Sequence, residues 1–153
     1  MLDYRPIPYS AIPDIGLYMD QVLSFLEREL GVFYKDSREN ILTKSMVNNY
    51  VKAGILQKPA RKKYDQVHLS KMIMIYFLKN IISMEEIQPL VNHGDSPETL
   101  YETFRKIHCG IYENTSAPLE SIEKKPTSLE VVFYLILQAD INKRMAKELI
   151  KSL

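Results

Sequence analysis

The residues of this sequence that are best suited to chemistry are amide, hydroxyl and basic side chains between Leu42 and Leu69. They fall into a polar group in the segment LTKSMVNNYVK and a basic group in QKPARKKY. Asparagine pairs with the major-groove edge of adenine and lysine with that of guanine, whereas both Lys and Arg bind phosphates. Together they favour recognition of double-stranded DNA. The expected DNA-binding residues are Lys44, Ser45, Asn48, Asn49, Lys52, Lys58, Arg61, Lys62, Lys63 and Tyr64.

Charge is unevenly distributed along the chain, which has a net charge of only +1. From Leu42 to Lys79, eight basic residues face a single acidic one, Asp65, so this segment carries +7. The remaining twelve basic and eighteen acidic residues give −6. Such a division indicates a surface for a polyanion, because each Lys or Arg set against a phosphate releases condensed counterions.

A short helix must position the polar group. Thr43 can cap a helix from Lys44 to about Ala53, and Gly54 supplies the left-handed turn that ends it. The helical period directs four apolar residues toward a core and leaves the polar group for solvent or a groove. The core-facing residues are Met46, Val47, Tyr50 and Val51.

The basic group follows in a segment that Pro59 keeps from being helical, so it is expected to form a short wing. Asp65 then caps a third helix, His68 to about Asn80, whose dense apolar residues predict packing on more than one side. The region as a whole is typical of a helix-turn-helix followed by a basic wing. In that geometry the first side chains of the recognition helix reach base edges, and the wing holds phosphates.

Periodicity elsewhere is also helical, and it predicts an all-α fold. A first helix should begin after Pro13, with Asp14 as its cap and with Ile15 and Tyr18 on its apolar stripe. The other expected helices start at the capping box Ser83–Glu86, at Ser96 with Pro97 in the first helical position, and at Leu129, the last running to about Ser152.

The order and spacing of these elements resemble the MerR-type winged helix-turn-helix of bacterial transcription regulators. The matching pieces are the Thr43 cap, Tyr50, Gly54-Ile55-Leu56, Arg61-Lys62-Lys63-Tyr64 and Ser83-Met84-Glu85-Glu86-Ile87. The whole chain, including YMDQVLSFLE and LTKSMVNNYVKAGIL, is still more similar to a bacterial family known as domain of unknown function 1836. The MerR resemblance implies DNA binding, whereas the second brings no established activity.

Two departures from the MerR pattern affect the expected site. Asn48 stands where MerR proteins usually have an arginine, so adenine recognition replaces that arginine's contact. The wing lacks the usual glycine turn and is several residues shorter, so a short or degenerate wing is expected.

We expect a MerR-like DNA-binding domain over residues 1–92 and a helical dimerisation or regulatory region over 93–153. Apolar residues lie around nearly the whole of the segment Leu129 to Ile141, which indicates burial either within the monomer or against a second copy. Dimerisation is the favoured interpretation. A small-molecule effector remains unidentified; Phe104, Tyr112, Phe133 and Tyr134 can line a pocket for it, although aromatic residues at helical spacing usually form core.

Catalysis and metal binding find little support in the sequence. His68, His93 and His108 have no ligand spacing, and Glu85 and Glu86 fit the capping box better than an acid–base pair. We therefore expect no enzyme activity, no metal and no cofactor. The single Cys109 and the absence of a secretory signal or of an apolar run long enough to cross a bilayer predict a cytoplasmic protein without membrane contact.

The predicted function is sequence-specific binding of double-stranded DNA by a transcription regulator. The alternative is a helical protein-interaction adaptor that retains the fold without DNA readout and binds an acidic protein partner through the same basic segment. A small-molecule sensor without DNA contact leaves the +7 segment unexplained.

Overall fold

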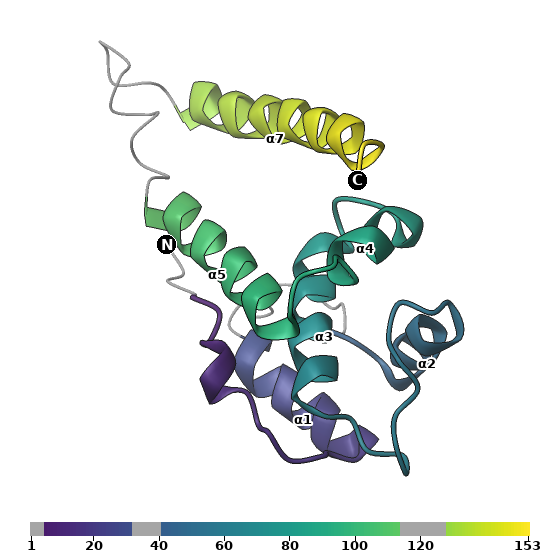
Figure 1. Ribbon diagram of the computed structural model, residues 1–153. Coiled ribbons are helices and arrows are strands. Elements are labelled where there is room, and N and C mark those ends of the chain that lie inside the picture. Colours follow the sequence, from purple (N-terminus) through teal and green to yellow (C-terminus); the bar gives the residue numbers. More distant parts are fainter. Residues whose placement is uncertain (1–4, 32–40, 114–127) are drawn as a thin grey trace.

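The computed structural model describes residues 5–31, 41–113 and 128–153, and Figure 1 shows their arrangement. Within these ranges the chain is mainly helical, with isolated β-bridges and no β-strand of its own. The elements are a 3₁₀ turn η1 (Tyr9–Ala11) and the helices α1 (Met19–Leu30), α2 (Lys44–Lys52), α3 (Gln66–Leu78), α4 (Met84–Val91), α5 (Pro97–Glu113) and α7 (Ser128–Ile150). The all-α prediction is confirmed at this level.

Helix α3 is the centre of the core. Leu69, Met72, Ile73 and Ile75 are fully buried, and α1, α4 and α5 pack around them. The prediction that this helix packs on more than one side is thus confirmed. Figure 1 shows α3 upright in the middle of the molecule, with α1 below it and α2 standing to one side. Because α2 lies at the periphery, one of its faces is left for solvent.

Local capping signals place most helix starts where the sequence predicted them. The Thr43 hydroxyl accepts a hydrogen bond from the Met46 amide at 3.2 Å, and Gly54 ends the α2 turn with a φ of +74°. Asp65 caps α3 through the His68 amide at 3.1 Å. Ser83 and Glu86 exchange the two bonds of a capping box at the start of α4. These contacts satisfy amides that have no partner inside a helix.

The predicted start of the first helix is wrong. Helix α1 begins at Met19 rather than after Pro13, and Asp14 caps nothing. Leu17 instead forms an antiparallel bridge with Tyr64, and the two residues exchange backbone hydrogen bonds. Ile15 and Tyr18, which were expected on the buried stripe, are 66% and 53% exposed. A long-range backbone pairing has therefore outweighed a local capping signal.

Helix α5 completes the core from the C-terminal side. Tyr101 of this helix is fully buried in the core, and its hydroxyl donates a hydrogen bond to the Ile7 carbonyl at 2.8 Å. Two further bonds hold the N-terminal segment on α5, from the Arg105 Nε to the Pro6 carbonyl at 2.8 Å and from the Tyr9 amide to the Glu102 carboxylate at 2.7 Å. Residues 6–9 of the segment before α1 are consequently held against α5.

Helix α7 contacts the rest of the molecule through α4. Lys147 pairs with Glu86 at 3.1 Å, and Ile150 packs against the core. Leu135 and Ile141 are exposed, so these two residues of the segment Leu129 to Ile141 are not buried within the monomer, and burial against a second copy stays the prediction for them. The side chains of residues 129–134, 136, 137 and 140 lie outside those that the structure describes.

No helix within the described ranges combines the length and the apolar character that a bilayer span requires.

Candidate nucleic-acid interface

Helix α2 presents a polar face to solvent because its apolar residues are spaced for the opposite side. Val47 and Tyr50 are buried, and Met46 and Val51 are half-buried against the core, as the helical period predicted. The exposed residues of this face are Lys44, Ser45, Asn48, Asn49 and Lys52. No carboxylate lies within α2, so the face carries only amide, hydroxyl and ammonium groups.

The basic group forms a tight turn instead of an extended wing. The Lys63 amide donates to the Ala60 carbonyl at 2.9 Å, which closes a four-residue turn, and Arg61 and Lys62 occupy its two central positions. Their φ values are +52° and +62°. Positive φ at both central positions is typical of the type I′ hairpin turn, where glycine or asparagine is usual. Two long cationic side chains are therefore held at the tip in a conformation that L residues rarely adopt. We refer to Ala60–Lys63 as the basic turn.

The N-terminal segment braces the basic turn from one side. Leu17 and Tyr64 exchange two backbone hydrogen bonds of 2.8 Å each. Gly16 lies so close that a Cβ atom added to it would sit 2.9 Å from the Cβ of Lys63. The Lys63 ammonium lies 5.2 Å from the centre of the Tyr18 ring, within the range of a cation–π contact. Lys63 is thereby fixed against Gly16 and Tyr18, while Arg61 and Lys62 project from the tip.

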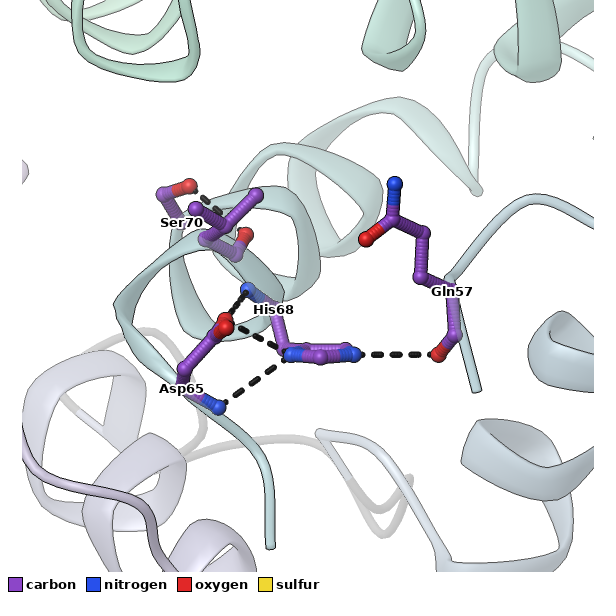
Figure 2. A network of polar contacts seen from close by, with 5 residues as sticks. Gln57, Asp65, His68 and Ser70 are labelled. Atoms are coloured by element: carbon purple, nitrogen blue, oxygen red, sulfur yellow. Dashed lines mark hydrogen bonds and ion pairs between the residues drawn. The ribbon is translucent and has the colours of Figure 1, made fainter. Parts of the chain in front are cut away.

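A polar network around His68 holds the residues that flank the basic turn, Gln57 before it and Asp65 after it (Figure 2). His68 is buried in the first turn of α3, and its Nε2 donates to the Gln57 carbonyl at 3.0 Å. Its Nδ1 lies 2.7 Å from the Asp65 Oδ1. Burial acts to raise the pKa of Asp65, but the hydrogen bonds from the backbone and ring of His68 outweigh it and hold the pKa below its ordinary value. The chain entering the turn at Gln57 and leaving it at Asp65 is thus tied to one histidine.

Two adjoining hollows lie between α2, the basic turn and the start of α1. The first, about 290 Å³, is lined by Asn48, Val51, Lys52, Lys58, Pro59, Lys62 and Tyr64. The second, about 340 Å³, is lined by Tyr18, Met19, Asp20, Lys44, Asn48, Pro59, Lys62 and Tyr64. Asn48 and Lys62 border both, so the polar face of α2 and the tip of the basic turn form one continuous surface. This surface is called the basic face below.

The ten predicted residues divide into two sets in the structure. The lining of the hollows brings together Lys44, Asn48, Lys52, Lys58, Lys62 and Tyr64. Ser45, Asn49, Arg61 and Lys63 are exposed nearby but line neither hollow.

Tyr64 is the buried member of the ten, at 4% exposure, and its ring packs edge-on against His68 at 5.4 Å. It forms part of the wall of both hollows. Burial raises the pKa of Tyr64, which keeps its hydroxyl protonated as a hydrogen-bond donor.

The residues at this surface that were not predicted as part of it include Tyr18 and Asp20, which line the second hollow, and Gly16, which packs against Lys63. The sequence placed Tyr18 on the buried stripe of a helix, and it assigned no role to Asp20. Of these residues, Gly16 alone could have indicated the contact from sequence, because an isolated glycine often marks a place where another backbone comes close. The sequence did not show which backbone that is.

Of the predicted effector residues, Phe104 has a described side chain, so the predicted pocket as a whole lies outside the described residues. Phe104 packs at 5.7 Å from Phe77 and 6.2 Å from His108, and the side chains of Tyr112, Phe133 and Tyr134 fall outside the description. A separate cavity of about 870 Å³ lies beside α5 and is lined by Arg5, Glu98, Thr99, Glu102, Thr103, Arg105, Lys106, Cys109, Gly110 and Glu113.

The described residues contain no group of three or more His, Cys, Asp or Glu side chains placed to hold a metal ion. His68 is used by the polar network, and His93 pairs with Asp95 at 3.2 Å. His108 lies between aromatic rings, with its centroid 4.8 Å from that of Phe77.

Fold and surface together define a mainly helical protein with one basic face. Comparison with protein families places the chain: residues 7–104 match the family described as domain of unknown function (DUF1836), and the chain belongs to that family. The matched region runs from the N-terminal segment through α4 into α5, and it includes every residue of the basic face. Searches of curated proteins and of solved structures gave no match.

Proposed function

We propose that this protein is a sequence-specific double-stranded DNA-binding transcription regulator. The observation that carries the proposal is the basic face, on which the exposed polar side of α2 and the tip of the basic turn adjoin around shared hollows. A major groove about 12 Å wide admits an α-helix, and positive residues flanking that helix can bind the phosphates on either side.

The finer fold assignment belongs to the same proposal. Helix α2, the turn at Gly54 and the basic turn occur in the order of a MerR-like winged helix-turn-helix, with the wing reduced to four residues. A reduced wing supports phosphate contact close to α2 rather than a long reach along the duplex. The contacts of Leu17 with Tyr64 and of His68 with Gln57 favour a basic turn that is already in position before DNA binds.

The proposal assigns different tasks to different residues. Lys44, Ser45, Asn48 and Asn49 lie in the first turns of α2 and contact base edges, with Asn48 central because it borders both hollows. Lys52, Lys58, Arg61, Lys62 and Lys63 bind phosphates and position the domain. The Tyr64 hydroxyl adds a phosphate hydrogen bond.

A homodimer is part of the proposal because one small domain alone binds DNA with modest affinity, which two linked domains increase. Ile141, Met145, Leu149 and Leu153 follow one another at four-residue spacing on and just after α7, and all are at least half exposed. Burying this stripe against a second copy removes apolar surface from water and pairs two α2 helices for half-sites about one or two helical turns apart. Sedimentation tests this part: a strictly monomeric protein at high concentration would contradict it.

Selection of bound duplexes from a random DNA library tests the proposal. The wild type should enrich a motif, and Lys62→Ala/Lys63→Ala should bind all sequences more weakly and with a shallower salt dependence. The matched control is Lys106→Ala/Lys143→Ala, which removes the same charge from exposed positions on α5 and α7. Failure of the wild type to enrich any motif would contradict the proposal and favour the adaptor, which uses the basic face for an acidic protein.

A further inference from the structure

Asp20 is the one carboxylate on the walls of the two hollows that form the basic face. It lines the second hollow together with Lys44, Asn48 and Lys62, the residues proposed to meet DNA. Its side chain is exposed in the first turn of α1. Within residues 5–31, 41–113 and 128–153, no hydrogen bond or ion pair engages it.

An exposed acid in this position works against binding of the phosphate backbone. Like charges repel, so a carboxylate beside Lys44 and Lys62 lowers the attraction of the face for every duplex equally, whatever its sequence. A helix N-terminus does favour a carboxylate in its first turn, which gives Asp20 a modest structural role in α1. That role does not require the carboxylate to be unpaired on the wall of a hollow that it shares with Lys44 and Lys62.

A carboxylate can offset its repulsion from the phosphates by binding a hydrogen-bond donor on a base. It accepts a hydrogen bond and cannot donate one, and the exocyclic amino groups of bases are the donors that the major groove offers. Cytosine N4 is the usual partner of aspartate and glutamate there. Discrimination of this kind combines attraction for one base with repulsion from the others.

We propose that Asp20 is a specificity-determining residue of the basic face, which accepts a hydrogen bond from the amino group of a cytosine beside the bases contacted by α2. This inference rests on the proposed function and adds a reader from outside the recognition helix. The segment before α1 then positions Asp20, because the pairing of Leu17 with Tyr64 places the start of α1 beside the basic turn.

The test compares the motifs selected by the wild type, Asp20→Asn and Asp20→Ala. Asparagine has nearly the same shape but pairs with adenine, so Asp20→Asn should shift one position of the motif from cytosine to adenine. Asp20→Ala should lose the preference at that position, about fivefold or more, and should bind unrelated duplexes more tightly than the wild type. Asp14→Asn removes the same charge from an exposed residue outside both hollows and should leave the motif unchanged.

The outcomes separate this inference from the proposed function. A wild-type motif that neither Asp20 variant alters, in proteins with wild-type circular dichroism, overturns the inference and leaves the proposed function in place. A uniform gain in affinity for all duplexes with an unchanged motif also overturns it, since Asp20 then acts only as a charge. A wild type that binds no duplex overturns both.

Discussion

Leu17 and Tyr64 are joined by two backbone hydrogen bonds of 2.8 Å across 46 intervening positions of the chain. This pairing brings the start of α1 to the basic turn and makes the N-terminal segment part of the basic face. It also places Gly16 against Lys63, where a side chain has no room.

Substitution of Gly16 by alanine tests the brace. The new Cβ would meet the Lys63 Cβ at 2.9 Å, so the turn or the segment must shift. We expect the free energy of unfolding to fall by about 1–3 kcal/mol, as in overpacked sites, and DNA affinity to fall as well. Thermal unfolding and a binding titration measure the two effects. Gly94→Ala is the control, because its Cβ would meet open space; equal stability of the two variants would contradict the prediction.

The conformation of the basic turn predicts opposite effects on stability and binding. Arg61→Asn/Lys62→Gly supplies residues that tolerate positive φ, and it should raise the free energy of unfolding by about 1–2 kcal/mol. The same change removes two cations and should weaken DNA binding. Arg61→Ala/Lys62→Ala removes the charges but keeps two L residues at these angles, so it should weaken binding without the stabilisation. Chemical denaturation distinguishes them, and equal stability of both variants would count against strain at the turn.

Asp65 gives the protein a dependence on strongly acidic pH. Its folded-state pKa is lowered from the ordinary value of 3.8, so its ionised form stabilises the fold above that pH. This contribution is lost as pH falls through the lowered pKa. Asp65→Asn retains a side chain that caps helices well but loses the charge. The variant should be less stable than the wild type at pH 7, and the difference should shrink below pH 3.8; a constant difference in denaturation midpoints would refute the assignment.

His108 should act in a milder pH range. Burial lowers its pKa from 6.5, and within the described part of the chain its Nδ1 has no hydrogen-bond partner. The unfolded chain therefore binds a proton first as pH falls below about 6.5, and stability falls until the folded-state pKa is reached. His108→Phe and His108→Asn both remove this loss, whereas only phenylalanine keeps an aromatic ring beside Phe77. Melting temperatures measured between pH 5 and 8 check this, and an unchanged pH dependence in both variants would reject it.

Sequence signals that act over one helical turn predicted much of the structure. Thr43, Asp65 and Ser83 each meet an amide three residues later, so side-chain chemistry alone indicated those helix starts. The polar face of α2 followed equally from the period of Val47 and Tyr50. A helix start at Asp14 was wrong because pairing between Leu17 and Tyr64 decides that segment, and no local pattern encodes a partner so distant. Asp20 was missed for the same reason, since it joins the basic face only through that pairing.

The bond between Leu17 and Tyr64 also orders events during folding. It closes a loop that contains all of α1 and α2, and closing a loop of this length costs conformational entropy that only later contacts offset. The unfolded chain carries the same lysines and arginines but no fixed spacing between them. The proposed recognition of DNA is therefore acquired late, when the two ends of the loop meet, and an incompletely folded chain has the charge of this surface without the proposed selectivity.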